Sequence, residues 1–128
     1  MAIPYKVIER GEPGVTGGGT KQFYALTSTR SRVKLSDLAR SISRMSSLSR
    51  PDIMAVLEAL TELIPEHLLM GRIIELGNLG SMGVSLSSAP SATADEVTSS
   101  NIKSARSIFR PGKELRDALN NADFEKVS

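Results

Sequence analysis

The sequence contains no cysteine, no tryptophan and only one histidine. Without cysteine, a disulfide framework, a thiolate nucleophile and a cysteine-ligated zinc site are all excluded. The single histidine, His67, has no potential ligands at metal-binding spacing, so we expect it to pack at a helix edge. Paired carboxylates in a recognisable catalytic context are also lacking. The sequence therefore gives little support to an enzyme and predicts neither a metal nor a cofactor.

Long hydrophobic runs and aromatic residues are scarce as well. No stretch approaches the ~18 apolar residues of a membrane span. The first residues, Met-Ala-Ile-Pro-Tyr-Lys, lack the apolar run of a signal peptide. We therefore expect a cytoplasmic protein without membrane contact. Aromatic residues make up 4% of the 128 residues, so the core must be built from Leu, Ile, Val, Met and Ala. This length predicts a single domain.

The net charge is only +2, but the charges are distributed unevenly. Residues 30–50 carry basic side chains against one acid, Asp37, and residues 101–116 carry basic side chains against one acid, Glu114. Most of the remaining acids lie between these two basic zones. Such a distribution can attract phosphate, but it is also typical of solvated helix faces. Charge alone leaves both interpretations open.

The first third of the chain predicts a β-hairpin. Residues 3–10 and 21–29 read as strands, and the glycine- and proline-rich residues 11–20 between them predict a long loop. Gly14 and Gly19 have the spacing of a phosphate-binding loop. However, the lysine at position 21 is preceded by threonine rather than glycine, and a strand rather than a helix follows. We therefore predict no nucleotide site.

Two helices are predicted next. Apolar residues recur at helical spacing over 35–47, where Ser36 is the candidate N-cap, and over 51–70. Pro65 predicts a kink or break of the second helix near Leu63, and Gly71 predicts its end. Downstream we expect a strand over 72–76, a tight turn over 77–80 and a returning strand over 81–86. A stretch low in bulky residues, a strand over 102–109 and a short amphipathic helix follow.

This order of elements resembles the HU and integration-host-factor family of DNA-bending proteins. Leu35–Leu48 and Pro51–Met70 resemble the family's two helices. The sequence Gly-Asn-Leu-Gly-Ser-Met at 77–82 resembles its strand turn, and Phe-Arg-Pro-Gly-Lys-Glu-Leu at 109–115 resembles the entry to its last helix. The resemblance covers about residues 34–121. The added N-terminal strands resemble a variant branch in which an HU domain carries extra strands.

The resemblance implies an α+β, HU-like fold: two helices, a β-sheet with a hairpin arm and a short C-terminal helix. Residues 1–33 would form the N-terminal hairpin extension and residues 34–128 the HU-like domain. It also implies an intertwined homodimer, which the wide apolar stripes of both helices favour independently, since a chain of this size buries little core alone. We expect the dimer core to include Leu38, Ile42, Ile53, Leu57, Leu60, Leu79 and Phe109.

The implied function is that of a histone-like, nucleoid-associated bacterial protein. Its partner would be the phosphate backbone of double-stranded DNA, with no small-molecule substrate. The expected phosphate contacts are Arg72, Lys103, Arg106, Arg110 and Lys113, and Pro90 is the one candidate for a minor-groove wedge. In this sequence the arm, residues 87–100, has no Lys or Arg and contains Asp95 and Glu96. The alternative is therefore a structural or protein-interaction dimer on the same scaffold, with little DNA binding.

Overall fold

The computed structural model describes residues 1–127 and divides the chain into two compact units. The first, here called the sheet unit, contains residues 1–34 together with the chain from Leu119 onwards. The second, here called the helix–arm unit, contains Leu35–Ala118. Together, residues 1–127 contain three α-helices and two three-stranded sheets, one sheet in each unit. The α+β class predicted from the sequence is confirmed.

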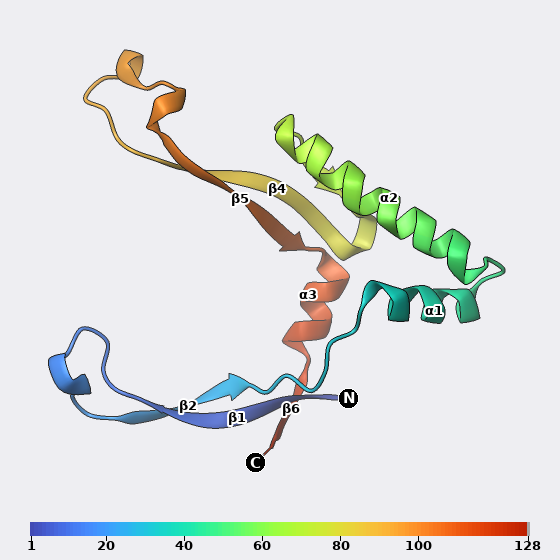
Figure 1. Cartoon of the computed structure of the whole chain (residues 1–128). Coiled ribbons are helices and arrows are strands. Elements are labelled where there is room, and N and C mark those ends of the chain that lie inside the picture. Colours follow the sequence, from blue (N-terminus) through green and yellow to red (C-terminus); the bar gives the residue numbers. More distant parts are fainter. Residues whose placement is uncertain (128) are drawn as a thin grey trace. The chain divides into compact units, whose positions relative to one another are not determined.

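The sheet unit is built on the predicted N-terminal hairpin. Strand β1 (Ala2–Arg10) pairs antiparallel with β2 (Gln22–Thr27), and a single 3-10 turn (Thr16–Gly18) lies in the loop between them (Figure 1). Strand β6 (Asp123–Lys126) pairs with β1 in parallel, which gives the order β2-β1-β6. Strand β6 was not predicted from the sequence. The end of the chain therefore joins the hairpin rather than the helices.

Two helices open the helix–arm unit, α1 (Leu35–Met45) and α2 (Arg50–Leu69). The prediction that Ser36 caps the first helix was wrong: α1 already begins at Leu35, so Ser36 lies inside its first turn. A true N-cap precedes α2. There the Ser49 hydroxyl accepts a hydrogen bond from the Asp52 N–H at 3.4 Å and donates one to the Asp52 carboxylate at 2.8 Å.

Helix α2 is continuous through Pro65, so of the kink or break predicted near Leu63, the break does not occur. An interior proline removes one hydrogen bond and crowds the carbonyl group four residues before it, but the hydrogen bonds on either side carry the helix onward. Helix α2 ends at Leu69, just before Gly71, as the sequence predicted. Gly71 has a positive φ of 75°, its N–H donates to the Leu68 carbonyl, and the Arg72 N–H donates to the His67 carbonyl. These two bonds form a Schellman motif.

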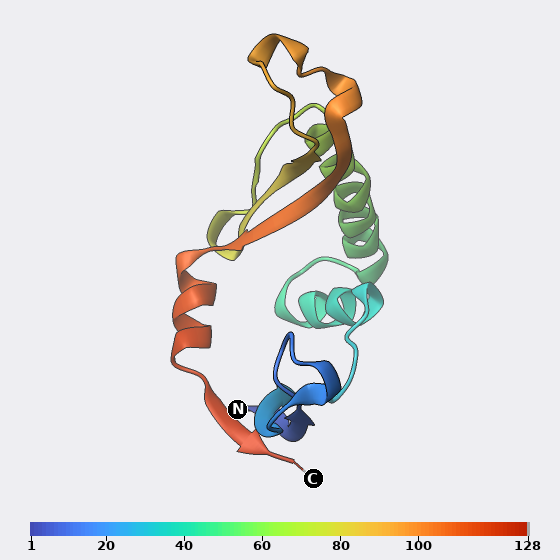
Figure 2. The same cartoon turned by 90° about the vertical axis from the view of Figure 1, so that its left-hand side faces the viewer.

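A β-ribbon with a hairpin arm follows. Strands β3 (Ile74–Glu75), β4 (Gly80–Ser88) and β5 (Ile102–Pro111) form an antiparallel sheet in that order, and α3 (Lys113–Asn120) follows β5. A 3-10 turn, Gly77–Leu79, connects β3 and β4. The β4–β5 ribbon runs past α2, and its tip, residues 89–101, projects away from the helices (Figures 1 and 2).

The arm tip is held together by Asn101. Its backbone carbonyl accepts a hydrogen bond from the Ala89 N–H at 2.8 Å, and its side-chain amide donates to the Ala89 carbonyl and to the Ser91 hydroxyl. The Asn101 side-chain oxygen also accepts from the Thr98 N–H. The tip is therefore an ordered pair of short 3-10 turns, Ala94–Glu96 and Ser99–Asn101.

Gly80 and Gly112 allow the turn before β4 to approach the end of β5. The Gly112 N–H donates to the Leu79 carbonyl at 2.9 Å, and Gly80 has a φ of 143°. A methyl group on Gly112 would overlap the Asn78 carbonyl, and one on Gly80 would overlap the Arg110 carbonyl. Backbone atoms cannot move aside as a flexible side chain can. Both positions therefore require glycine.

Gly112→Ala is expected to destabilise the fold by about 2 kcal/mol or more, because backbone must shift to admit the methyl group. The matched control is Gly83→Ala on β4, where the added methyl group would meet only the Ile73 side chain at an ordinary 3.9 Å. Urea denaturation of both variants checks this. Equal stability of the two variants would contradict the close approach described above.

Candidate nucleic-acid interface

The β4–β5 ribbon has one basic face. In its register, Ser81 lies opposite Arg110 and Ser85 lies opposite Arg106. Directly opposed residues of an antiparallel pair project to the same side, and every second residue of a strand does so. Arg106 and Arg110 therefore share one face, here called the basic face, with mostly small neighbours. The other residues on this face are Ser81, Gly83, Ser85, Ser87, Ser104 and Ile108.

The opposite face of the ribbon is apolar. Met82 lies opposite Phe109, Val84 opposite Ser107 and Leu86 opposite Ala105. Phe109, Val84 and Leu86 are 47%, 42% and 57% exposed, so this face lacks a complete cover within the described residues. The ribbon thus separates charge from apolar surface, as a sheet does when one side faces solvent or a polar partner and the other faces a core.

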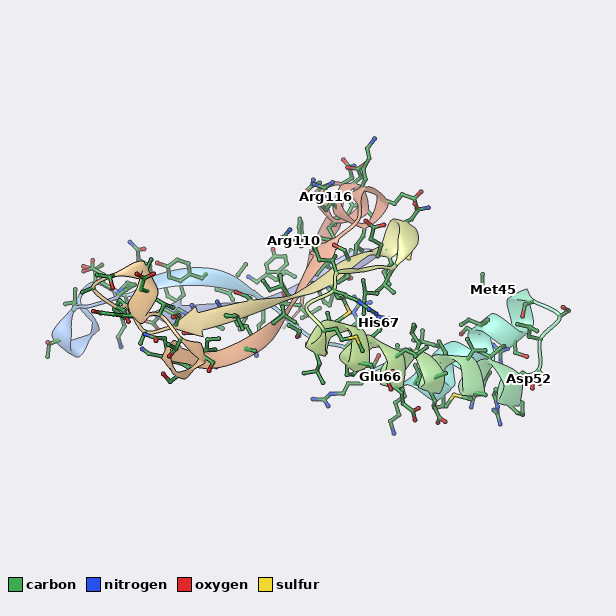
Figure 3. All side chains as sticks on the ribbon, turned by 90° about the horizontal axis from the view of Figure 1, so that it is seen from above. Met45, Asp52, Glu66, His67, Arg110 and Arg116 are labelled. Atoms are coloured by element: carbon green, nitrogen blue, oxygen red, sulfur yellow. The ribbon has the colours of Figure 1, made fainter. Side chains whose placement is uncertain are left out.

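Arg106 and Arg110 are exposed, and neither forms an ion pair with any residue in 1–127. Figure 3 shows Arg110 on the ribbon close to the start of α3, which carries Arg116. Glu75 on β3 pairs with Ser81 on β4, and Ser81 pairs with Arg110 on β5. The Glu75 carboxylate therefore shares the basic face with Arg110, two strands away. At a strand spacing of about 4.8 Å, their backbones are roughly 10 Å apart, which is about one Debye length at 0.1 M salt.

Lys103 occupies an irregular position at the base of the arm. Ser87 pairs with Ser104 and Ser88 pairs with Ile102, so Lys103 has no opposite residue and forms a β-bulge. Bulges of this kind redirect a side chain and increase the local twist. Strict alternation therefore does not assign Lys103 to a face. Lys113 lies beyond the other end of the ribbon, as the exposed first residue of α3.

Arg72 is engaged by the end of α2. Its guanidinium lies 3.0 Å from the Nδ1 atom of His67, and because arginine only donates, the imidazole nitrogen accepts. His67 is half-buried on α2 (Figure 3). This contact identifies a structural role for both residues, at the junction between α2 and the ribbon. No group of three or more metal-ligating side chains is found among residues 1–127.

An open cavity of about 750 Å³ lies between the C-terminal end of α2 and the ribbon. Arg72, Arg106 and Arg110 all contribute to its lining, whereas Lys103 and Lys113 do not. Most of the other side chains that line it are apolar: Leu68, Leu69, Ile73, Met82, Val84, Leu86 and Ile108. A lining of this kind suits apolar side chains better than a phosphate group.

The arm places acids at its tip. Asp95 and Glu96 lie in the 3-10 turn Ala94–Glu96, the part of the arm between the two hydrogen-bonded flanks. Pro90 is exposed and lies next to Ala89, the residue that closes the tip by its bonds with Asn101. Pro90 is thus at the base of the tip loop. Asn101 was not predicted as a functional or structural residue, and no sequence pattern around it signals its bonding role.

The first basic zone of the sequence is divided between the two units. Arg30 belongs to the sheet unit, where its guanidinium forms an ion pair with Glu125 at 2.8 Å. Arg40, on α1 of the helix–arm unit, lies 4.0 Å from the Asp37 carboxylate. The first basic zone therefore does not lie within one unit. Within the helix–arm unit, Arg106 and Arg110 place two cations without ion-pair partners among residues 1–127 on one face of the ribbon.

Comparison with known proteins identifies a family and solved structures of similar fold. Residues 1–126 match the model of the HU-HIG family, described as an HU domain fused to a winged helix-turn-helix, an immunoglobulin or a glycine-rich motif. No curated protein matches the sequence. A crystal structure from Bacteroides vulgatus, described as a "Putative bacterial DNA binding protein", is similar in fold, with 18% identity and a TM-score of 0.63. The similarity covers 98% of this chain but only 48% of that chain.

Proposed function

Because the chain belongs to the HU-HIG family, we propose that it is a histone-like protein that binds double-stranded DNA through the phosphate backbone. It would bind without reading base sequence and would act as a homodimer in the bacterial nucleoid. The observation that carries the proposal is the basic face of the ribbon. Arg106 and Arg110 stand there on either side of Ile108, opposite serines, and have no ion-pair partner in residues 1–127. Small neighbours let a phosphate backbone approach closely.

Lys103 and Lys113 would extend this contact to either end of the ribbon. Both are exposed, one at the bulge and one at the start of α3. Arg72 would add positive charge near the same surface, although its guanidinium is also bound to His67. Contacts of this kind fix a protein on the duplex and contribute affinity, but they carry no sequence information. No enzymatic activity or cofactor is proposed.

The proposed homodimer follows from apolar surface that a single chain leaves uncovered. On α1, Leu38, Ile42 and Met45 are exposed at positions i, i+4 and i+7, which form one stripe. On α2, Val56, Leu60 and Leu63 repeat the same spacing and are exposed as well. The apolar face of the ribbon adds Val84, Leu86 and Phe109. Only Ala39, Ile53 and Gly80 are buried among residues 1–127.

The total exposed surface supports the same proposal. The chain exposes 10589 Å², whereas a compact monomer of 13.7 kDa exposes about 6,600 Å². Treating the two units as independent globules raises that figure only to about 8,000 Å². Part of the excess is the apolar surface of α1, α2 and the ribbon, which a second copy would cover. Five of the residues expected in the dimer core, Leu38, Ile42, Leu60, Leu79 and Phe109, are at least 37% exposed.

The experiment that tests DNA binding is equilibrium binding of the chain to several unrelated duplexes of equal length, repeated over a series of salt concentrations. Sequence-independent backbone contact predicts affinities within about threefold of one another at each salt concentration, since single mismatched base pairs cost specific proteins ~1–3 kcal/mol each. A strong preference for one duplex would replace the proposal with sequence-specific recognition.

A second candidate function is a protein-interaction dimer on the same scaffold. It is favoured by the arm, which carries two carboxylates in the turn Ala94–Glu96 and no cation from residue 87 to residue 100. Carboxylates repel phosphate, so an arm of this composition does not add to backbone binding.

No helix within residues 1–127 is long and apolar enough to cross a membrane.

The role of the arm can be tested at Pro90, the one wedge candidate. If binding is carried by the ribbon, Pro90→Ala should change DNA affinity less than about twofold and leave any DNA bend unchanged, because a minor-groove wedge is not in use. Bending is measured by energy transfer between dyes at the two ends of a duplex. Loss of a bend in Pro90→Ala, with affinity retained in Pro90→Val as control, would instead assign the wedge role to Pro90.

A further inference from the structure

Strand β2 forms an open edge of the sheet unit. The Ser28 N–H donates to the Pro4 carbonyl at 2.9 Å, so positions 28 and 4 form a hydrogen-bonded pair. Such pairs alternate along an antiparallel ladder. The N–H and C=O groups of Phe23, Ala25 and Thr27 consequently point away from β1. The Val127 N–H donates to the Tyr5 carbonyl, which supports this alternation, because Tyr5 is opposite Thr27 and faces β6.

The two edges of this sheet differ in charge. Strand β6 carries Asp123, Glu125 and Lys126 within four residues, and charged side chains of this density discourage pairing with another strand. Strand β2 carries no charged residue, and the uncharged run continues from Gln22 to Thr29. All six residues of β2 are exposed, including Phe23 at 70%. An exposed, uncharged edge with unpaired backbone groups is a template for a further strand.

We propose that the β2 edge pairs with the β2 edge of a second copy of this chain, antiparallel about a two-fold axis at Ala25. This pairing is self-complementary. Ala25 lies opposite its own copy and Phe23 lies opposite Thr27, so all outward-facing groups of these three residues find partners. Tyr24 lies opposite Leu26 and Gln22 opposite Ser28, so no like charges meet. The nearest cations, Lys21 and Arg30, lie outside the paired segment, and Arg30 is bound to Glu125.

A second copy is favoured over a strand of another protein by this match. In this register the uncharged segments of the two copies lie opposite each other. The cations that flank the segment then stand opposite neutral residues, for example Lys21 of one copy opposite Thr29 of the other. The pairing goes beyond the proposed DNA binding and uses a surface other than the helix stripes. A six-residue strand buries too little for a stable dimer alone, so this contact acts in addition to the proposed helix-mediated interface.

Amide hydrogen exchange measured by NMR tests the pairing residue by residue. In the wild-type chain the amides of Phe23, Ala25 and Thr27 are expected to exchange ~10-fold or more slowly than loop amides, with protection that rises with protein concentration. Ala25→Pro removes the outward N–H but no bond to β1. It should therefore abolish protection at Phe23 and Thr27 and preserve it at Tyr24 and Leu26. Ala25→Val, which keeps the N–H, is the matched control.

A disulfide test covers the case in which Ala25→Pro unfolds the hairpin. The chain has no native cysteine, so Ala25→Cys introduces a single thiol. Opposed residues of a hydrogen-bonded pair have Cα atoms about 5.5 Å apart, within the range for a disulfide. Mild oxidation should link most of Ala25→Cys into covalent dimers and little of Val7→Cys, which is also exposed on this sheet.

Free exchange at Phe23, Ala25 and Thr27 at every concentration would overturn the proposal, as would protection that does not depend on concentration. Equal cross-linking of Ala25→Cys and Val7→Cys would also overturn it. These outcomes are separable from failure of the proposed DNA binding, because neither measurement involves DNA.

Discussion

Reversing the charge of Arg106 and Arg110 together is expected to abolish binding to duplex DNA. Both residues project from the basic face of the ribbon and neither has an ion-pair partner among residues 1–127. Each lost phosphate contact reduces the slope of log affinity against log salt concentration by about 0.9. The loss of two contacts per protomer therefore removes most of the electrostatic contribution to binding. The introduced carboxylates would then repel the backbone. Fluorescence anisotropy with a labelled duplex measures the loss.

The matched control reverses two cations of the sheet unit, Lys6→Glu with Arg10→Glu. Both lie on β1, and the pair changes the net charge by the same amount. Its affinity should fall far less than that of the ribbon variant. Equal losses would mean that net charge alone, and not the basic face, drives binding. Retained binding in the Arg106 and Arg110 variant, with the fold intact by circular dichroism, would remove the basic face as the DNA contact.

Truncating Phe109 is expected to destabilise the folded protein by about 3–5 kcal/mol, the usual cost of removing a buried phenyl group. In a single chain Phe109 is 47% exposed, so a monomer would lose much less. The full cost arises only if a second copy covers the apolar face of the ribbon. Urea denaturation at several protein concentrations measures both the loss and the dimer, because the midpoint of an obligate dimer rises with concentration.

Val97→Ala serves as the control for Phe109→Ala. Val97 lies in the arm tip and is 51% exposed, close to the value for Phe109, but it belongs to neither helix stripe nor to the apolar face of the ribbon. Its truncation should cost well under 1 kcal/mol, as is usual for exposed positions. Similar small effects in both variants, with a midpoint independent of concentration, would show that the isolated chain is the stable form.

Local signals predicted most of the helices and turns. Apolar spacing located α1 and α2, and Gly71 located the end of α2 because a positive φ is easiest for glycine. The hairpin and the strand turn were found from glycine and proline. A break was predicted near Pro65 but does not occur, because the cost of one lost hydrogen bond is set against the remaining hydrogen bonds and packing of the whole helix. Strand β6 was missed because four residues that include three charges carry no pattern, and its partner is more than 100 residues away in the sequence.

The candidate site was less predictable than the fold. Its cations were visible in the sequence, but their arrangement depends on the register of β4 and β5. That register places Arg106 and Arg110 on one face, and the bulge removes Lys103 from the alternation. The end of α2 holds Arg72 against His67, a contact across five residues that composition does not reveal. Charge counts could therefore name the residues but could not say which of them form one surface.

The most direct test of the central claim is the salt dependence of wild-type binding to an arbitrary duplex. If Arg106 and Arg110 of two protomers each neutralise one phosphate, the logarithm of the affinity should fall linearly with the logarithm of salt concentration, with a slope of roughly −3 to −4. Contacts by Lys103 and Lys113 would steepen it. Absence of any affinity near ~50 mM salt, where phosphate contacts are least screened, would contradict DNA binding and leave the protein-interaction dimer.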